Sequence, residues 1–271
     1  MTKRFAKLFL LPLLVMAFAL AGCTSGGSGE VAESHLSKMM KTKKIRVAVL
    51  PDNPPWSILN ASGNFEGYDI DIANRLAEAM GGLKVEFVST DGANRLPLIQ
   101  TDKVDVVIAS YTATNERAKS IAFTEAYAAA GPLPLYRKDN PITSYDDLAG
   151  KKVSVTRGST NDSVMSKYFP DTEVVRFDTI ADAFMAVKTG KVDALIEENP
   201  IVYEFADKNP EMEALPLDPY KPGYIAMAVQ QGDQIWLNYL NNFIRDFNNS
   251  GDNAELYKKW FGRDLPKLVN Y

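Results

Sequence analysis

The stretch LKVEFVSTDGANRLPLIQTDKVDVVIA (residues 83–109) decides the fold class. Residues 83–88 alternate between apolar and polar side chains, which predicts a strand, and residues 94–100 follow as a short helix. Residues 104–109 are nearly all apolar, which is typical of a strand covered on both faces. A strand, a helix and a second strand in this order indicate an α/β fold with a parallel sheet.

The same alternation extends in both directions along the chain. Upstream, residues 45–50 read as a strand and residues 68–80 as a helix that Gly81 and Gly82 end. Downstream, strands are predicted at 151–155, 173–177 and 192–196, and helices at 163–168 and 179–189. The chain then returns to a strand at 224–229 and to helices at 234–248 and 254–261. We therefore expect two similar lobes: residues 44–132 start lobe 1, residues 133–220 form lobe 2, and residues 221–271 return to lobe 1.

Composition excludes several classes of protein. The chain has 271 residues, 46% hydrophobic and 24% charged, which rules out a disordered chain, a collagen and a multi-span membrane protein. Thirty bases against 34 acids give a net charge of −4, so no basic excess indicates nucleic acid as a partner. One cysteine and one histidine exclude an internal disulfide and all but exclude a Cys/His zinc site or a catalytic triad. We expect no cofactor and no metal.

The first 22 residues have the pattern of a secretory signal. Three basic residues precede an apolar run at 8–22 of about 15 residues, which is shorter than the roughly 20 that span a membrane. The sequence LAGC at 20–23 resembles the bacterial lipobox, in which the cysteine, here Cys23, is lipidated and becomes the new N-terminus. An ordinary signal with a coincidental cysteine, or a short anchor helix, is the alternative.

Removal of the signal makes the mature chain more acidic. It leaves 27 bases against 34 acids, a net charge of −7. Residues 23–43 begin with a Gly/Ser-rich stretch, and we expect them to form a flexible tether. His35 lies in this tether and is expected to have no role.

Ligands of two-lobed α/β proteins bind in the crevice at the carboxyl ends of the strands. The segments to inspect are therefore 52–56, 91–95, 110–117, 157–162 and 197–199. The strongest local pattern is SYTATNER (residues 110–117), which combines hydroxyls, backbone N–H groups and Arg117 after a buried strand. Such a set suits a carboxylate. A surface turn with a solvated arginine explains the same segment equally well.

The chain resembles the bacterial periplasmic amino-acid-binding proteins, the polar-amino-acid class of solute-binding proteins that feed ABC transporters. The resemblance covers about residues 44–266, through PPW (54–56), GYDIDIA (67–73), RLPLIQ (95–100), KVD (103–105), TATNERAK (112–119), FTEAY (123–127), GKVDA (190–194) and YKKWFG (257–262). It implies a two-lobed periplasmic-binding-protein fold of type II, each lobe a mostly parallel sheet flanked by helices. It also implies a monomeric, non-enzymatic lipoprotein on a bacterial membrane, with an ABC permease as its partner.

The resemblance assigns ligand-binding roles to residues of both lobes. Arg117 would hold the α-carboxylate of an amino acid, and Thr112 would donate a hydrogen bond to it. The backbone carbonyl of Ser110 would accept from the α-ammonium. In lobe 2, the turn that contains Ser159 and Thr160 would donate further N–H groups to the carboxylate.

The same resemblance places an acid of lobe 2 on the α-ammonium. The aligned residue is Glu198, where aspartate is more common. Because glutamate is one methylene longer, either the ligand sits differently or Glu197 shares the role. A buried zwitterion needs each charge paired, so Arg117 and Glu198 would each meet one end of it.

Selectivity depends on the positions around the ligand side chain. Asn53 and Gly92 stand where many relatives carry aromatic residues, so both walls are expected to be polar or open. In relatives that bind acidic amino acids, the residue at the position of Arg95 faces the ligand. The alternative is that Arg95 lies exposed at the start of a helix and does not contact the ligand. Glutamate or aspartate is therefore slightly favoured as the ligand over glutamine or asparagine. Trp56 is expected to pack in the core.

Two other functions fit the sequence. Cyclohexadienyl dehydratases, which act on prephenate or arogenate, resemble amino-acid-binding proteins, and Glu198 sits where their acid could protonate a leaving hydroxyl. The turn GSTND (158–162) is also close to theirs. A signalling or partner-binding pair of lobes is the other reading. The single histidine favours binding over turnover.

Overall fold

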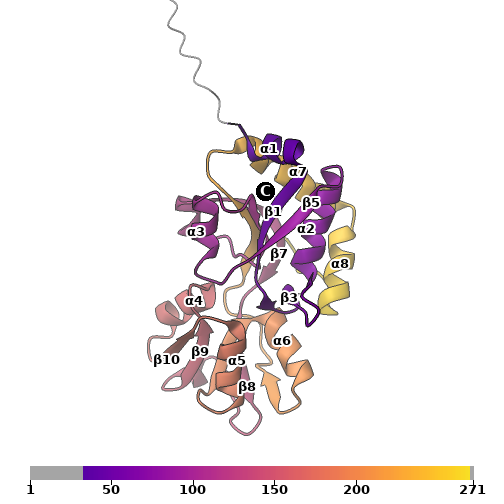
Figure 1. Cartoon of the computed structure of the whole chain (residues 1–271). Coiled ribbons are helices and arrows are strands. Elements are labelled where there is room, and N and C mark those ends of the chain that lie inside the picture. Colours follow the sequence, from indigo (N-terminus) through magenta and orange to yellow (C-terminus); the bar gives the residue numbers. More distant parts are fainter. Residues whose placement is uncertain (1–32, 269–271) are drawn as a thin grey trace, which may run out of the picture. The chain divides into compact units, whose positions relative to one another are not determined.

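The computed structural model describes residues 33–268, so the expected signal and the lipidation site Cys23 lie outside the described residues. Residues 34–268 form one compact unit. Within it, two five-stranded sheets are each flanked by helices (Figure 1). Among residues 33–268, no helix has the length and apolar character needed to cross a membrane.

The first sheet has the strand order β5-β1-β6-β13-β7. Its strands are β5 (Lys84–Ser89), β1 (Lys44–Val49), β6 (Val106–Val107), β13 (Gly223–Val229) and β7 (Ala122–Ala130). β1 is parallel to β5 and β6, whereas β13 is antiparallel to both β6 and β7. Four of the five strands therefore run in the same direction. The helices of this part, which we call lobe 1, are α1 (His35–Thr42), α2 (Tyr68–Ala79), α3 (Arg95–Gln100), α7 (Gln234–Asn249) and α8 (Asp252–Phe261).

The second sheet repeats this arrangement, with the order β10-β9-β11-β8-β12. Its strands are β10 (Glu173–Phe177), β9 (Lys152–Thr156), β11 (Ala194–Glu198), β8 (Pro132–Arg137) and β12 (Met212–Ala214). Here β8 is the strand of opposite direction. The helices of this part, lobe 2, are α4 (Thr160–Tyr168), α5 (Ile180–Lys188) and α6 (Asn199–Lys208). The expectation of two lobes with mostly parallel sheets is confirmed.

Short elements complete the chain. A small antiparallel sheet joins β2 (Asp52–Asn53), β3 (Ser57–Leu59) and β4 (Phe65–Glu66). Single 3-10 turns occur at η1 (Arg117–Lys119) and η2 (Asp146–Leu148).

Strand β1 shows why the first sheet is so apolar. Val47 and Val49 point into a core shared with α2, α7 and α8, while Ala48 and Leu50 belong to a second core that includes Ile99 of α3. Both faces of the sheet are thus covered, which accounts for the nearly continuous apolar runs.

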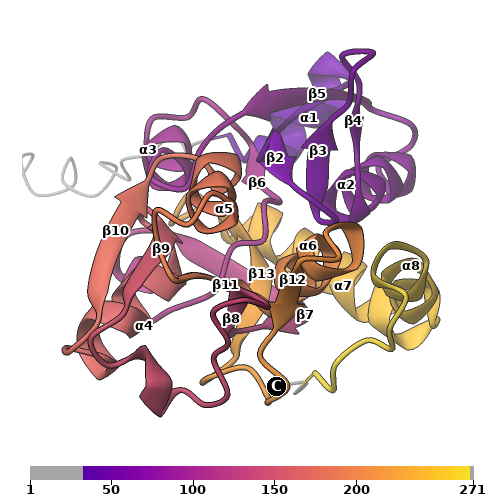
Figure 2. The ribbon, with the colours of Figure 1, turned by 90° about the horizontal axis from the view of Figure 1, so that it is seen from below.

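The chain crosses between the lobes at two places that lie against each other. Gly131 separates β7 from β8, and residues 215–222 lead from β12 to β13. A Cβ atom on Gly131 would lie 2.7 Å from Pro222 Cα, so a side chain does not fit between the crossings. Figure 2 shows the return, in which β13 runs beside β7. We propose that these two segments are the lobe boundaries.

Residues 23–43 were expected to form a flexible tether, but residues 35–42 form the helix α1. Ser34 caps this helix, and His35 is only 7% exposed. The His35 ring lies 2.9 Å from Asp102 Oδ1 through Nε2 and 2.9 Å from Asp233 Oδ2 through Nδ1. The prediction that His35 has no role is therefore wrong, because its partners lie far away in the sequence. The strands β7 and β8 and the helix α6 were also not predicted as elements.

Candidate functional site

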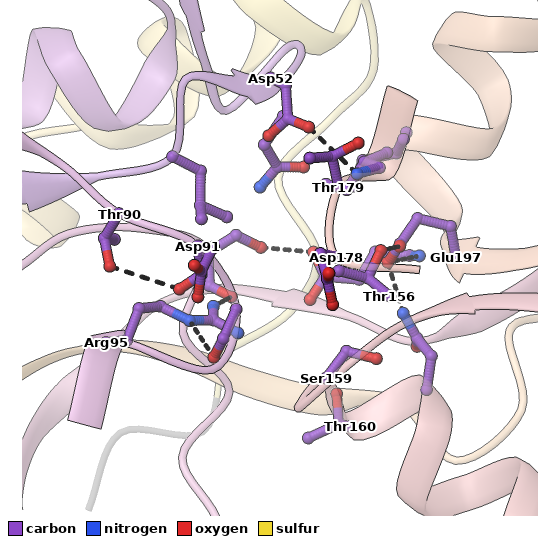
Figure 3. A pocket seen from close by; sticks show the side chains of 18 of the residues that line it. Asp52, Thr90, Asp91, Arg95, Thr156, Ser159, Thr160, Asp178, Thr179 and Glu197 are labelled. Carbon is purple, nitrogen blue, oxygen red and sulfur yellow. Dashed lines mark hydrogen bonds between the residues drawn. The ribbon is translucent and has the colours of Figure 1, made fainter. Parts of the chain in front are cut away.

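A cavity of about 300 Å³ lies where the parallel strands of both lobes end. In Figure 3, Asp52, Thr90 and Arg95 lie on one side and Asp178, Thr179 and Glu197 on the other. All eight ligand residues predicted from the sequence line this cavity: Asn53, Arg95, Ser110, Thr112, Arg117, Ser159, Thr160 and Glu198. The loops that follow buried strands thus bring these side chains together, as the position of the crevice in α/β proteins predicts.

A cationic corner forms around Arg117. Its Nη1 donates to the carbonyl of Thr112 at 2.7 Å, and its Nη2 donates to the carbonyl of Gly158 in lobe 2 at 3.1 Å. The hydroxyls of Thr112 and Thr160 lie 3.3 Å apart across the lobes. Burial lowers the pKa of Arg117 to about 10, and the nearby charge of Arg95 acts in the same direction. The group remains cationic at neutral pH and suits an anion such as a carboxylate.

An acidic corner lies at the end of β11. Glu197 and Glu198 are 3% and 7% exposed, and the hydroxyl of Ser110 in lobe 1 donates to Glu198. Burial raises the pKa of Glu197 to about 7. Burial raises the pKa of Glu198 to about 8, with a further contribution from the charge of Glu197. Such a pair stabilises a positive charge placed beside it.

Arg95 is buried rather than at an exposed helix start. The residue is only 5% exposed. Its Nη1 donates to the carbonyls of Ala109 (2.9 Å) and Ser110 (3.3 Å). Its guanidinium also lies 4.4 Å from the ring centre of Tyr111, as does that of Arg117. Burial lowers the pKa of Arg95. Much of its donor capacity is thus used to hold the loop at Ser110.

The Ser110 loop has a support that sequence reasoning missed. Ser110 has a φ of 46°, a backbone conformation that non-glycine residues rarely adopt. Its N–H donates to Asp69 Oδ2 at 2.8 Å, and Tyr127 donates to Asp69 Oδ1 at 2.9 Å. Asp69 is fully buried, which raises its pKa to about 7.

A second missed contribution comes from the start of α5. Asp178, Thr179, Ile180 and Ala181 line the cavity, and Asp52 Oδ2 accepts from the N–H of Ile180 at 3.0 Å. Burial raises the pKa of Asp52. The rule that ligands bind where strands end, applied to β10, would have found this segment.

The expected open wall at Gly92 is closed by lobe 2. A Cβ atom at Gly92 would lie 2.7 Å from the carbonyl oxygen of Arg157, so the backbone of lobe 2 occupies the place of a side chain. Trp56 is fully buried against Tyr68 and Phe261, as expected for a packing residue.

One set of possible metal ligands exists among the described residues. Atoms of His35, Asp102 and Asp105 lie within 4.8 Å of one another. The guanidinium of Arg46 already donates to both carboxylates, at 3.1 Å and 2.7 Å. Lys38 Nζ also lies 3.8 Å from Asp102 Oδ2, so two cations balance the two carboxylates and the cluster is an ion-pair network.

Residues 45–263 match the bacterial extracellular solute-binding proteins, family 3. The chain belongs to this family. A glutamine-binding protein of an ABC transporter from Bacillus subtilis (strain 168) is 32% identical over 95% of this chain and 98% of its own length. A solute receptor for L-cysteine from Neisseria gonorrhoeae superposes with a TM-score of 0.80 at 31% identity, over 84% of this chain and 93% of that one.

A third relative bears on the dehydratase alternative. An ancestral amino-acid-binding protein, described as a precursor of cyclohexadienyl dehydratase, superposes with a TM-score of 0.79 at 33% identity, over 84% of this chain and all of that one. It is an amino-acid-binding protein and not itself named as a dehydratase. As a member of solute-binding family 3, the present chain is a binding protein and not an enzyme.

Proposed function

We propose that this solute-binding protein captures an amino acid between its lobes and delivers it to an ABC permease. The observation that carries the proposal is one cavity with a guanidinium from lobe 1, Arg117, and a carboxyl pair from lobe 2, Glu197 and Glu198. The α-carboxylate of an amino-acid zwitterion can pair with the guanidinium, and its α-ammonium can pair with the carboxyl pair. The relatives named as binding glutamine and L-cysteine support the same class of ligand.

The residue roles follow from the chemistry of the two corners. Arg117 and the hydroxyl of Thr112 would bind the α-carboxylate from lobe 1, with the N–H groups of Ser159 and Thr160 from lobe 2. The carbonyl of Ser110 and the carboxylate of Glu198 would bind the α-ammonium. Each end of the ligand would thus contact both lobes, so binding would stabilise the closed arrangement.

Calorimetry with the twenty standard amino acids tests this function. We expect one or a few of them to bind, and Arg117→Ala to abolish that binding because the α-carboxylate loses its bidentate partner. Arg245→Ala is the matched control, since Arg245 is exposed on α7 and pairs with Glu125 outside the cavity. Absence of binding by every amino acid, or unchanged binding by Arg117→Ala, would overturn the proposal.

The preference for an acidic amino acid has no support. It depended on Arg95 being available to a side-chain carboxylate, whereas three of its five N–H groups, on Nε and Nη1, already donate to backbone carbonyls. Neither named ligand of the relatives is acidic. We therefore propose a polar amino acid without an acidic preference.

We also propose that the chain is an exported lipoprotein held to a bacterial membrane through Cys23. The family is extracellular, and the sequence LAGC at 20–23 supports lipid attachment. Expression in a bacterial host should place the protein in the detergent phase after phase partitioning. Cys23→Ser should move it to the aqueous phase, and equal partitioning of the two would contradict the proposal.

A further inference from the structure

Two residues that line the cavity each have a buried amide oxygen with no hydrogen-bond partner among the described residues. These oxygens are Oδ1 of Asn53 and Oδ1 of Asn161, in residues that are 2% and 1% exposed. Both residues line the cavity, Asn53 from lobe 1 and Asn161 from lobe 2. Buried acceptors left unpaired are costly, so a ligand that donates to them gains affinity.

The orientation of the Asn161 amide is fixed by its neighbours. Its Nδ2 donates to Oε1 of Glu197. The same Oε1 accepts from the backbone N–H of Glu198 at 3.0 Å, while Oε2 accepts from Thr156 Oγ1 at 3.1 Å. Because Oε1 faces a backbone donor, it stays an acceptor even when the carboxyl is protonated on Oε2. A flipped amide would place two oxygens together, so Asn161 presents its oxygen as an acceptor.

The charges around the cavity also favour a ligand side chain that donates hydrogen bonds. Five carboxyl groups and two guanidinium groups line it: Asp52, Asp91, Asp178, Glu197 and Glu198 against Arg95 and Arg117. Arg117 and Glu198 are assigned to the α-groups of the ligand, and Asp178 is paired with Arg157 at 2.9 Å, which leaves Asp52, Asp91 and Glu197 against Arg95. A further carboxylate on the ligand side chain would therefore meet an excess of acids, whereas an N–H donor, neutral or cationic, would not.

We infer that the cavity selects an amino acid whose side chain ends in an N–H donor. The side-chain oxygens of Asn161 and Asn53 accept the hydrogen bonds from this donor. The class comprises carboxamide, guanidinium, imidazole and ammonium side chains. The inference rests on the proposed function, because Arg117 and Glu198 must first fix the α-groups. Asn161 and Asn53 are then specificity-determining residues, and Glu197 is a positioning residue that holds the Asn161 amide.

Calorimetry of the unmodified protein with matched ligands provides the first test. Glutamine and glutamate have the same shape, and methionine is an apolar analogue of similar length. We expect glutamine or arginine to bind at least about tenfold more tightly than glutamate and methionine, since the latter two leave the acceptors unpaired. Preference for glutamine or for arginine would distinguish a neutral from a cationic donor. Glutamate or methionine binding as tightly as both would overturn the inference.

Variants of the two asparagines provide the second test. Asn161→Leu and Asn53→Ala should each weaken binding of the preferred ligand about tenfold while leaving methionine binding the same or stronger. Asn74→Leu, at an exposed position of α2, is the control. An equal loss for both ligands would show a merely structural role and overturn the inference. If no amino acid binds the unmodified protein, the proposed function itself fails.

Discussion

The proposed contact between Glu198 and the ligand ammonium would link ligand binding to proton release. Burial and the charge of Glu197 raise its pKa to about 8 in the unliganded protein, so it is largely protonated at pH 7. A ligand ammonium beside it favours the ionised form and lowers that pKa. Binding at pH 7 should therefore release up to about one proton, and affinity should rise with pH up to about 8.

Calorimetry in buffers of different ionisation enthalpy measures this release. The observed heat should depend on the buffer for the unmodified protein, with protons passing from protein to buffer. Glu198→Gln removes the titrating group, so any remaining binding should show much less buffer dependence. Identical heats in all buffers for the unmodified protein would contradict the prediction.

Sequence reasoning found cavity-lining residues that lie together in a single loop. Ser110, Thr112 and Arg117 follow one buried strand within eight residues, so their proximity could be expected. Asp69 could not be found in this way. Its role depends on the left-handed conformation of Ser110, 41 positions later, whose N–H it accepts. Backbone conformation at a distant loop leaves no pattern around the residue that supports it.

At the scale of elements, Gly92 controls how closely the β5–α3 loop approaches lobe 2. A methyl group there would clash with the backbone oxygen of Arg157, which cannot move as freely as a side chain. Gly92→Ala should lower the midpoint of thermal unfolding of the unliganded protein, because the two loops already lie against each other there. It should also weaken ligand binding about tenfold or more, because ligand binding stabilises the same closed arrangement. Calorimetry with differential scanning fluorimetry measures both, and unchanged affinity would contradict this role.

Helix α1 is stabilised by the single histidine. His35 bridges the loop after α3 and the start of α7, and the side chain of Asp233 is only 11% exposed. His35→Leu should lower the free energy of unfolding by about 1–3 kcal/mol, because it leaves a buried carboxylate with fewer donors. Urea unfolding measures the change. Met40→Ala, at an exposed position of the same helix, should have little effect, and equal losses would contradict the bridge.

The helices and strands differ in how well the sequence predicted them. Helices α2 and α5 were found because their apolar residues recur at helical spacing and face a core. Helix α1 was read as a tether because it is short, basic and adjacent to Gly/Ser-rich sequence. Its stability comes from tertiary contacts 67 and 198 positions away, which no local pattern contains.

At the scale of the whole described unit, the two lobes already contact each other across the cavity. Ser110 binds Glu198, Thr112 lies beside Thr160, and Asp52 accepts from the start of α5. The sequence predicted two lobes from the repeated strand and helix pattern. It could not predict these contacts, because they depend on how far the lobes close.

Carboxyl groups whose pKa burial raises, Asp52 among them, determine how the stability of the unliganded protein varies with pH. Burial raises the pKa of Asp69 and Glu197 to about 7 and that of Glu198 to about 8. The folded state therefore binds more protons than the unfolded state from about pH 4 to about pH 8. The free energy of unfolding should fall as pH rises from 5 to 8. Asp102 and Asp233 have lowered pKa values and contribute only at more acidic pH.

Urea unfolding at pH 5, 6, 7 and 8 measures this dependence. Glu198→Gln should give a shallower decline, because one of the titrating groups with a raised pKa is gone. Saturating ligand should also make the decline shallower, since a bound ammonium keeps Glu198 ionised and its affinity increases with pH over the same range. A free energy of unfolding that rises between pH 5 and pH 8 in the unliganded protein would show that these carboxyl groups are not buried as the closed cavity requires.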